Sequence, residues 1–305
     1  MKTRPRAIIA VTAIAMSGVM LTGCTSQDAP PGDTASEFGH VHGLGYDPGA
    51  GIVFAATHLG VWALPASELP SSFGAGSLAS PPDGVPLLIE DRRQDTMGFF
   101  VTNDGLLLAS GHPDPTDTAA PTNLGLISSD TAAREWTTVS LAGEADFHDI
   151  AATTTSTGAS RIYGYDATRG LIRISDDGGT TWSDGATMDL RDLTIDSTNP
   201  DRVYATTASG VQISDDAART FTAMPDAPAL FLIATTDTGL VGIDTSGVIW
   251  ASDGAGWIQG GTVTGEPQAL AFVSGSAPWL LISDDRGVVA TADLGATTVP
   301  LVKAQ

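Results

Sequence analysis

The stretch Ile174-Ser-Asp-Asp-Gly-Gly-Thr-Thr-Trp182 decides the fold of this chain, because degenerate copies of it recur through most of the sequence. Each residue type in it suits a tight turn. Ser175 and Asp177 can bond nearby backbone N–H groups, Gly179 tolerates a positive φ angle, and Trp182 can anchor the turn to an apolar layer. We therefore expect these four residues to be structural.

A second signal, glycine followed by Leu or Val and a short strand, marks six repeated units. It occurs at Gly60-Val61, Gly125-Leu126, Gly170-Leu171, Gly210-Val211, Gly247-Val248 and Gly287-Val288. Turns like the opening stretch follow five of these, around Asp130, Asp177, Asp216, Asp253 and Asp293. Apart from a longer first interval, which contains an insertion at 65–86, the units are 37 to 45 residues apart.

Each unit also holds two earlier runs that are typical of strands, since they are β-branched or aromatic and are bounded by Gly, Pro, Asn or Asp. Examples are 43–47 with 52–57, 193–196 with 202–206, and 269–273 with 279–283. Several strands in a repeat of about 40 residues are typical of propeller blades. The sequence predicts an all-β fold, a six-bladed β-propeller at 38–305.

Read as S-x-D-x-G-x-T-W, the stretch resembles the Asp-box of bacterial neuraminidase repeats. Asp-box propellers include sialidases, sortilin-like ectodomains, photosystem II assembly factor-like proteins and xyloglucanases. The N-terminal half is similar to a bacterial family of exported propellers named as glycosyl hydrolases, through His40-Val-His-Gly-Leu, Ala56-Thr-His-Leu-Gly, Met97-Gly-Phe, Ser110-Gly-His-Pro-Asp-Pro, Asn123-Leu-Gly-Leu-Ile and Asp146-Phe-His. This resemblance implies a fold more than a reaction.

The N-terminus has the layout of a secretory signal peptide at 1–23, with basic residues, an apolar run at 7–21 and small residues before Cys24. The Leu-Thr-Gly-Cys ending resembles the lipobox of bacterial lipoproteins. That resemblance implies a lipidated Cys24, a flexible tether at 24–37 and a propeller anchored to the extracytoplasmic face of the cell membrane. Cys24 is the single cysteine, so we expect no intrachain disulfide.

The formal net charge is −21, and removal of the signal peptide would take away basic residues but no acidic ones. Such a surface repels phosphates and favours cations, so nucleic acid is not expected as a partner. We attribute most of the acidity to solubility rather than to a bound cation. We expect a monomer.

The five histidines are expected to gather on one face, around blades 1 to 3. His42 and His148 begin inner strands, His58 and His112 end second strands, and His40 lies just before His42. Imidazole is a common ligand for zinc and copper. The pattern therefore predicts either a metal site or histidines that only pack and form hydrogen bonds.

Other polar or soft side chains are expected on the same face. Met97 takes the place of His42 in blade 2 and would favour copper, while Asp114 and Asp146 could orient imidazoles. Arg191 takes the corresponding place in blade 4. We interpret Met97, Asp114 and Arg191 as candidate ligand-binding residues.

A glycosidase-type hydrolase is the enzymatic alternative, and it needs a pair of carboxylates. Glu144 and Asp146 are the candidate catalytic residues. A sialidase is disfavoured, because its family pattern implies an F-R-I-P motif near the first blade and an arginine triad. The sequence contains no F-R-I-P, and 38–64, the predicted first blade, contains no arginine. The function classes left open are a lipoprotein binding a transition metal or small polar ligand, a glycoside hydrolase, and a scaffold for a protein partner.

Overall fold

The computed structural model describes residues 38–64, 85–275 and 278–303, which belong to one compact unit spanning Asp33–Gln305. Cys24, the predicted signal peptide and the predicted tether lie outside the described residues. Within the described part of the chain, no helix has the length and apolarity needed to cross a membrane.

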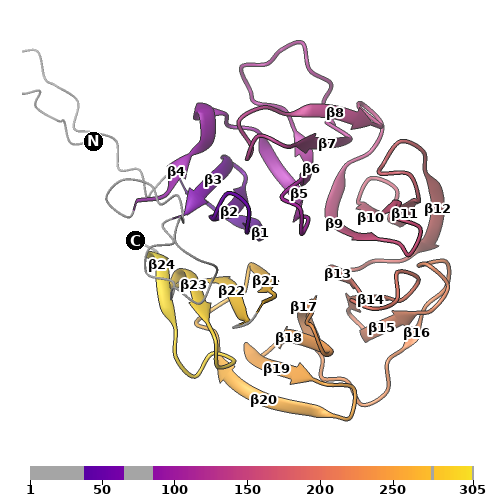
Figure 1. The fold of residues 1–305 in the computed structure, drawn as a ribbon, viewed down its shortest axis with the longest axis vertical. Coiled ribbons are helices and arrows are strands. Elements are labelled where there is room, and N and C mark those ends of the chain that lie inside the picture. The colour runs from indigo at the N-terminus through magenta and orange to yellow at the C-terminus, as the bar shows by residue number, and fades with distance from the viewer. Residues whose placement is uncertain (1–37, 65–84, 276–277, 304–305) are drawn as a thin grey trace, which may run out of the picture. The chain divides into compact units, whose positions relative to one another are not determined.

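Six four-stranded antiparallel sheets follow one another in chain order, and each forms one blade of a β-propeller (Figure 1). Blade 1 consists of β1 (Val41–Asp47), β2 (Ile52–Thr57), β3 (Gly60–Leu64) and β4 (Leu87–Leu88), followed by a 3-10 turn, η2 (Ile89–Asp91). Blade 2 consists of β5 (Asp95–Val101), β6 (Leu107–His112), β7 (Leu126–Ser129) and β8 (Thr137–Ser140). Blade 3 consists of β9 (Phe147–Thr154), β10 (Ser160–Asp166), β11 (Leu171–Ser175) and β12 (Ser183–Thr187).

The other three blades repeat the pattern. Blade 4 consists of β13 (Asp192–Ile195), β14 (Val203–Thr207), β15 (Gly210–Ser214) and β16 (Thr222–Ala223). Blade 5 consists of β17 (Leu230–Thr235), β18 (Leu240–Asp244), β19 (Val248–Ser252) and β20 (Trp257–Thr262). Blade 6 consists of β21 (Ala269–Val273), β22 (Trp279–Asp284), β23 (Gly287–Thr291) and β24 (Val299–Lys303). The predicted six-bladed propeller is confirmed.

The inner strands form the ring, since β1, β5, β9, β13, β17 and β21 each contact the next and β21 returns to β1. Apolar clusters fill the junctions between neighbouring blades. The cluster that joins blades 6 and 1 includes Trp62, Leu64, Leu281 and Val288, all nearly inaccessible to solvent. Burial of such side chains contributes about 1.5–3 kcal/mol each, so the core of this fold lies between the blades.

The opening stretch forms the turn between β11 and β12. The hydroxyl of Ser175 accepts a hydrogen bond from Gly179 N at 2.8 Å, and Asp177 Oδ1 accepts one from Thr181 N at 2.8 Å. The indole of Trp182 donates to Gly179 O at 3.0 Å. Gly178 N donates to Ser160 O at the start of β10. The β11–β12 turn therefore lies at the same end of the blade as the turn between β9 and β10.

Candidate functional site

Four of the inner strands, β1, β5, β9 and β17, begin with a β-bulge. In the first three, the extra residue is one that the sequence singles out. In blade 1, Val41 pairs with Thr57 and Gly43 with Ala56, which leaves His42 unpaired between them. The registers of blades 2 and 3 leave Met97 and His148 unpaired in the same way. Because a bulge kinks its strand and redirects the extra side chain, the three residues share one geometric position.

His42 lies against the histidine at the end of the second strand of its own blade. The Nε2 atom of His42 is 3.1 Å from Nε2 and 3.3 Å from Nδ1 of His58. The Nδ1 atom of His58 is in turn 2.8 Å from Asp95 Oδ1, at the start of blade 2. One ligand atom from each of these residues lies within 4.8 Å of the others. We call His42, His58 and Asp95 the three-ligand group.

His40 stands beside this group. Its ring centroid is 4.9 Å from that of His42 and 5.9 Å from that of His58. Burial, followed by the neighbouring charges of His58 and His40, lowers the pKa of His42 to about 3. Burial and His58 also lower the pKa of His40. Both imidazoles are therefore neutral near pH 7 and present lone pairs to a ligand.

A second histidine–carboxylate cluster lies one blade further along the chain. His148 Nε2 is 2.9 Å from Asp146 Oδ2, and His112 Nε2 is 3.8 Å from the same oxygen. His112 Nδ1 donates to Thr122 O at 3.0 Å. The other oxygen of Asp146, Oδ1, is buried and has no hydrogen-bond partner among the described residues.

Asp146 remains ionised in this setting. Burial acts to raise its pKa, but the hydrogen bond from His148 and the charges of His148 and His112 bring the pKa below its ordinary value. Glu144, the other proposed catalytic carboxylate, is exposed in the loop before β9.

The remaining predicted residues have more varied surroundings. Met97 is half-buried in β5, two residues after Asp95. Asp114 accepts hydrogen bonds from the hydroxyl and backbone N of Thr116 and from Arg93 N at 2.7 Å, and these bonds lower its pKa to about 2. These bonds place Asp114 in a turn rather than against an imidazole.

Arg191 spans part of the entrance to the central channel. Its Nη2 atom donates to Gln268 O of blade 6 at 3.0 Å, and its guanidinium lies 4.7 Å from the centre of the Phe231 ring. The channel is a cavity of about 370 Å³ lined by inner strands, and His42, His148 and Arg191 contribute to its wall.

A carboxyl pair in the channel wall, Asp149 and Asp192, was not predicted from the sequence. Asp149 Oδ2 accepts a hydrogen bond from Leu193 N at 2.6 Å, and Asp192 Oδ2 accepts one from Ile233 N at 2.8 Å. Burial raises the pKa of both carboxyls, and the charge of Asp192 adds to the effect on Asp149. The sequence does contain a signal for this pair. Blades 1 and 2 have glycine after His42 and Met97, whereas blades 3 and 4 have an aspartate at the equivalent place, in His148-Asp149 and Arg191-Asp192.

Asp95 was not predicted as a ligand from the sequence. It stands two residues before Met97, as His40 stands before His42 and Asp146 before His148. An alignment of the blades at the residue two before the bulge would have grouped Asp95 with His40 and Asp146, and so beside the histidines.

Comparison with solved structures supports the fold. No family model and no curated protein matches the chain. A chain in a nidogen/laminin complex superposes with a TM-score of 0.54 at 16% identity, covering 80% of this chain and 91% of that one. The GH74 enzyme of Niastella koreensis gives 0.54 at 16% identity, covering 87% of this chain. An ancestral GH74 enzyme gives 0.51 at 16% identity, covering 86% of it.

This chain spans only 38% of each of those two GH74 chains. At such low identity the likeness shows a shared β-propeller fold, and neighbours with that fold include glycoside hydrolases.

Proposed function

We propose that the three-ligand group binds one transition-metal ion, zinc or copper, with His40 as a neighbouring fourth ligand. The observation that carries this proposal is the approach of His42, His58 and Asp95 within 4.8 Å of one another. Ligand atoms about 2 Å from a tetrahedral zinc ion lie about 3.3 Å apart. The separations between the two imidazoles, 3.1 and 3.3 Å, match that spacing.

The electrostatics favour a cation at this place. A metal ligand must be deprotonated, and the lowered pKa values of His40 and His42 remove the proton competition that weakens many histidine sites near pH 7. Asp95 supplies a negative charge, and the protein as a whole carries a formal charge of −21.

We further propose that the lipidated Cys24 holds the propeller on the extracytoplasmic face of the membrane. Support comes from the lipobox-like Leu-Thr-Gly-Cys ending and the apolar run before it. Cys24→Ser should move the protein from the membrane fraction to the soluble fraction. Retention of that variant in the membrane fraction would exclude the lipid anchor.

A glycoside hydrolase is the second candidate, favoured by the shared fold of the GH74 neighbours and by the buried Asp146. An ionised Asp146 suits a nucleophile or a base better than a general acid, which needs a raised pKa. The acid would then be a residue such as Glu144. The hydrolase needs a second carboxyl group with a raised pKa near Asp146, whereas metal binding needs only the residues already in contact.

Metal analysis of protein purified without a histidine tag tests the first proposal. We expect about one equivalent of zinc or copper, and a loss of affinity of at least about 100-fold in His42→Ala. Asp117→Asn, in an exposed surface loop, is the control and should bind normally. No bound metal and no thermal shift with either ion would overturn the proposal.

A panel of glycosides separates the two candidates. Turnover that is lost in Asp146→Asn and kept in His42→Ala would establish the hydrolase and would leave the histidines with a packing role.

A further inference from the structure

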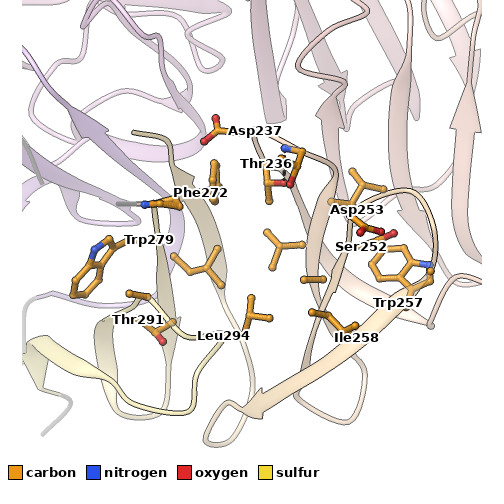
Figure 2. Close-up of a pocket in the computed structure, with 18 of the residues that line it drawn as sticks. Thr236, Asp237, Ser252, Asp253, Trp257, Ile258, Phe272, Trp279, Thr291 and Leu294 are labelled. Carbon is orange, nitrogen blue, oxygen red and sulfur yellow. Dashed lines mark hydrogen bonds between the residues drawn. The ribbon is translucent and has the colours of Figure 1, made fainter. Parts of the chain in front are cut away.

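A second cavity, of about 600 Å³, lies between blades 5 and 6 (Figure 2). Val241 and Ala251 line it from blade 5, and Phe272, Leu280 and Leu294 line it from blade 6. Its volume falls in the range of about 300–1,000 Å³ that is usual for pockets that bind small molecules. None of its lining residues belongs to the three-ligand group or to the second histidine cluster.

Strand registers show which side chains this junction lacks. In blade 3, Ile162 pairs with Ser175, and in blade 5, Leu240 pairs with Ser252 at the same place relative to the turn that follows. The junction between blades 3 and 4 is therefore directly comparable with the junction between blades 5 and 6.

Large side chains in the first junction are replaced by small ones in the second. Tyr163, fully buried, corresponds to Val241, and Ile174 corresponds to Ala251. The hydroxyl of Tyr163 crosses the first junction and donates to Pro200 O at 2.8 Å. The cavity is the space left where these two side chains are truncated.

The rim differs in the same direction. Arg161 closes the first junction through ion pairs with Asp176 and with Asp201 of blade 4. Its counterpart in blade 5 is Gly239, where a Cβ atom would lie 1.9 Å from Ser252 O. The backbone therefore excludes a plugging side chain at this position, and the cavity stays open at its rim.

Charge at the rim restricts the ligand. Asp237, between β17 and β18, and Asp253, after β19, are both exposed and line the opening, while no Lys, Arg or His occurs among the described lining residues (Figure 2). Apolar side chains form most of the wall. An apolar body with a positive end fits this arrangement, and an anionic end would meet two carboxylates.

We propose that this cavity binds a small amphiphile with an apolar body and a cationic head, such as an alkylammonium compound. The apolar body lies against Phe272, Leu280 and Leu294, and the head lies near Asp237 and Asp253. This site is separate from the metal site and does not depend on it.

Titration calorimetry with the full chain tests the proposal, using decyltrimethylammonium and decanoate as probes with opposite charge. We expect decyltrimethylammonium to bind at least about tenfold more tightly than decanoate. Asp237→Asn combined with Asp253→Asn should reduce that difference by at least about threefold, because it removes the carboxylates at the rim.

Two variants restore the bulk found between blades 3 and 4. Val241→Tyr and Ala251→Ile should each weaken binding of decyltrimethylammonium by at least about tenfold, while Ala223→Ile, at an exposed position of β16, should not. Circular dichroism confirms that each variant is folded. The proposal is overturned if the wild-type chain does not bind decyltrimethylammonium, if decanoate binds equally well, or if both filled variants bind like the wild type.

Discussion

The two histidine–carboxylate clusters have the same arrangement of strands but differ in which histidine lies within hydrogen-bond distance of the carboxylate. In both, a histidine at the end of a second strand faces an acidic residue that begins the next blade. His58 is 2.8 Å from Asp95, whereas His112 is 3.8 Å from Asp146. Asp146 is held instead by His148, at 2.9 Å.

The bulge residue makes the second difference. Blade 1 presents His42 at that position and blade 2 presents Met97, so only the first cluster combines two imidazoles from one blade with a carboxylate from the next. The repeated backbone supplies a bulge position in blades 1, 2, 3 and 5, and the residue type at that position decides whether a metal can be held there. This comparison predicts that the first cluster is the functional one.

The largest expected effect is on metal affinity. His58→Ala should weaken zinc or copper binding by at least about 100-fold, because it removes the residue that contacts both His42 and Asp95. His112→Ala, the matched change in the second cluster, should weaken it less than about tenfold. Titration calorimetry on the two variants measures the difference, and equal losses would mean that both clusters share one ion.

A gain of function should follow from making the second cluster like the first. Met97→His places an imidazole at the bulge position of blade 2, near the side of the ring that holds His112 and Asp146. We expect a second equivalent of zinc to bind, with lower affinity than the first because Asp146 is already bonded to His148. Elemental analysis after dialysis counts the ions. A stoichiometry that stays at one would show that the bulge position does not control binding.

The smallest effect concerns protons. Because the pKa of His42 is about 3 in the folded protein and near 6.5 in the unfolded chain, the unfolded chain binds the extra proton between these values. Proton uptake by the unfolded chain lowers the free energy of unfolding. The stability associated with a neutral His42 is therefore fully present above pH 6.5 and is lost as the pH falls toward 3. Histidine NMR should show His42 neutral at pH 5, and His58→Ala should raise its pKa. A His42 ring that titrates near pH 6.5 would contradict the burial seen here.

Much of the fold could be predicted because each strand carries its own local signal. The runs at 52–57 and 269–273 match β2 and β21 at both ends. The run at 43–47 is two residues shorter than β1, because the bulge at His42 interrupts the pairing that makes Val41 part of the strand. Alternation in sequence does not reveal a bulge, since the extra residue is defined by the partner strand.

The site was predicted in part, because only some of its residues stand out in the sequence. Histidines are rare in this chain, with five in all, so their positions stand out, whereas Asp95 is one of 35 acidic residues and does not. The carboxyl pair of Asp149 and Asp192 depends on contact between neighbouring blades, and the cavity between blades 5 and 6 depends on what Val241 and Ala251 lack. Both become visible only once the strand registers are known.

The closure of the ring has a consequence for how such a chain can be rearranged. Each blade consists of four consecutive strands, and within 38–64, 85–275 and 278–303 no strand is shared between blades 6 and 1. Side-chain packing and the hydrogen bond from Val41 N to Gln268 Oε1, at 3.0 Å, hold that seam. Chain order is therefore not what closes the propeller. A circular permutant that joins the two ends of the propeller and opens between any two blades keeps all six sheets whole, which makes the blade the natural unit of duplication and exchange.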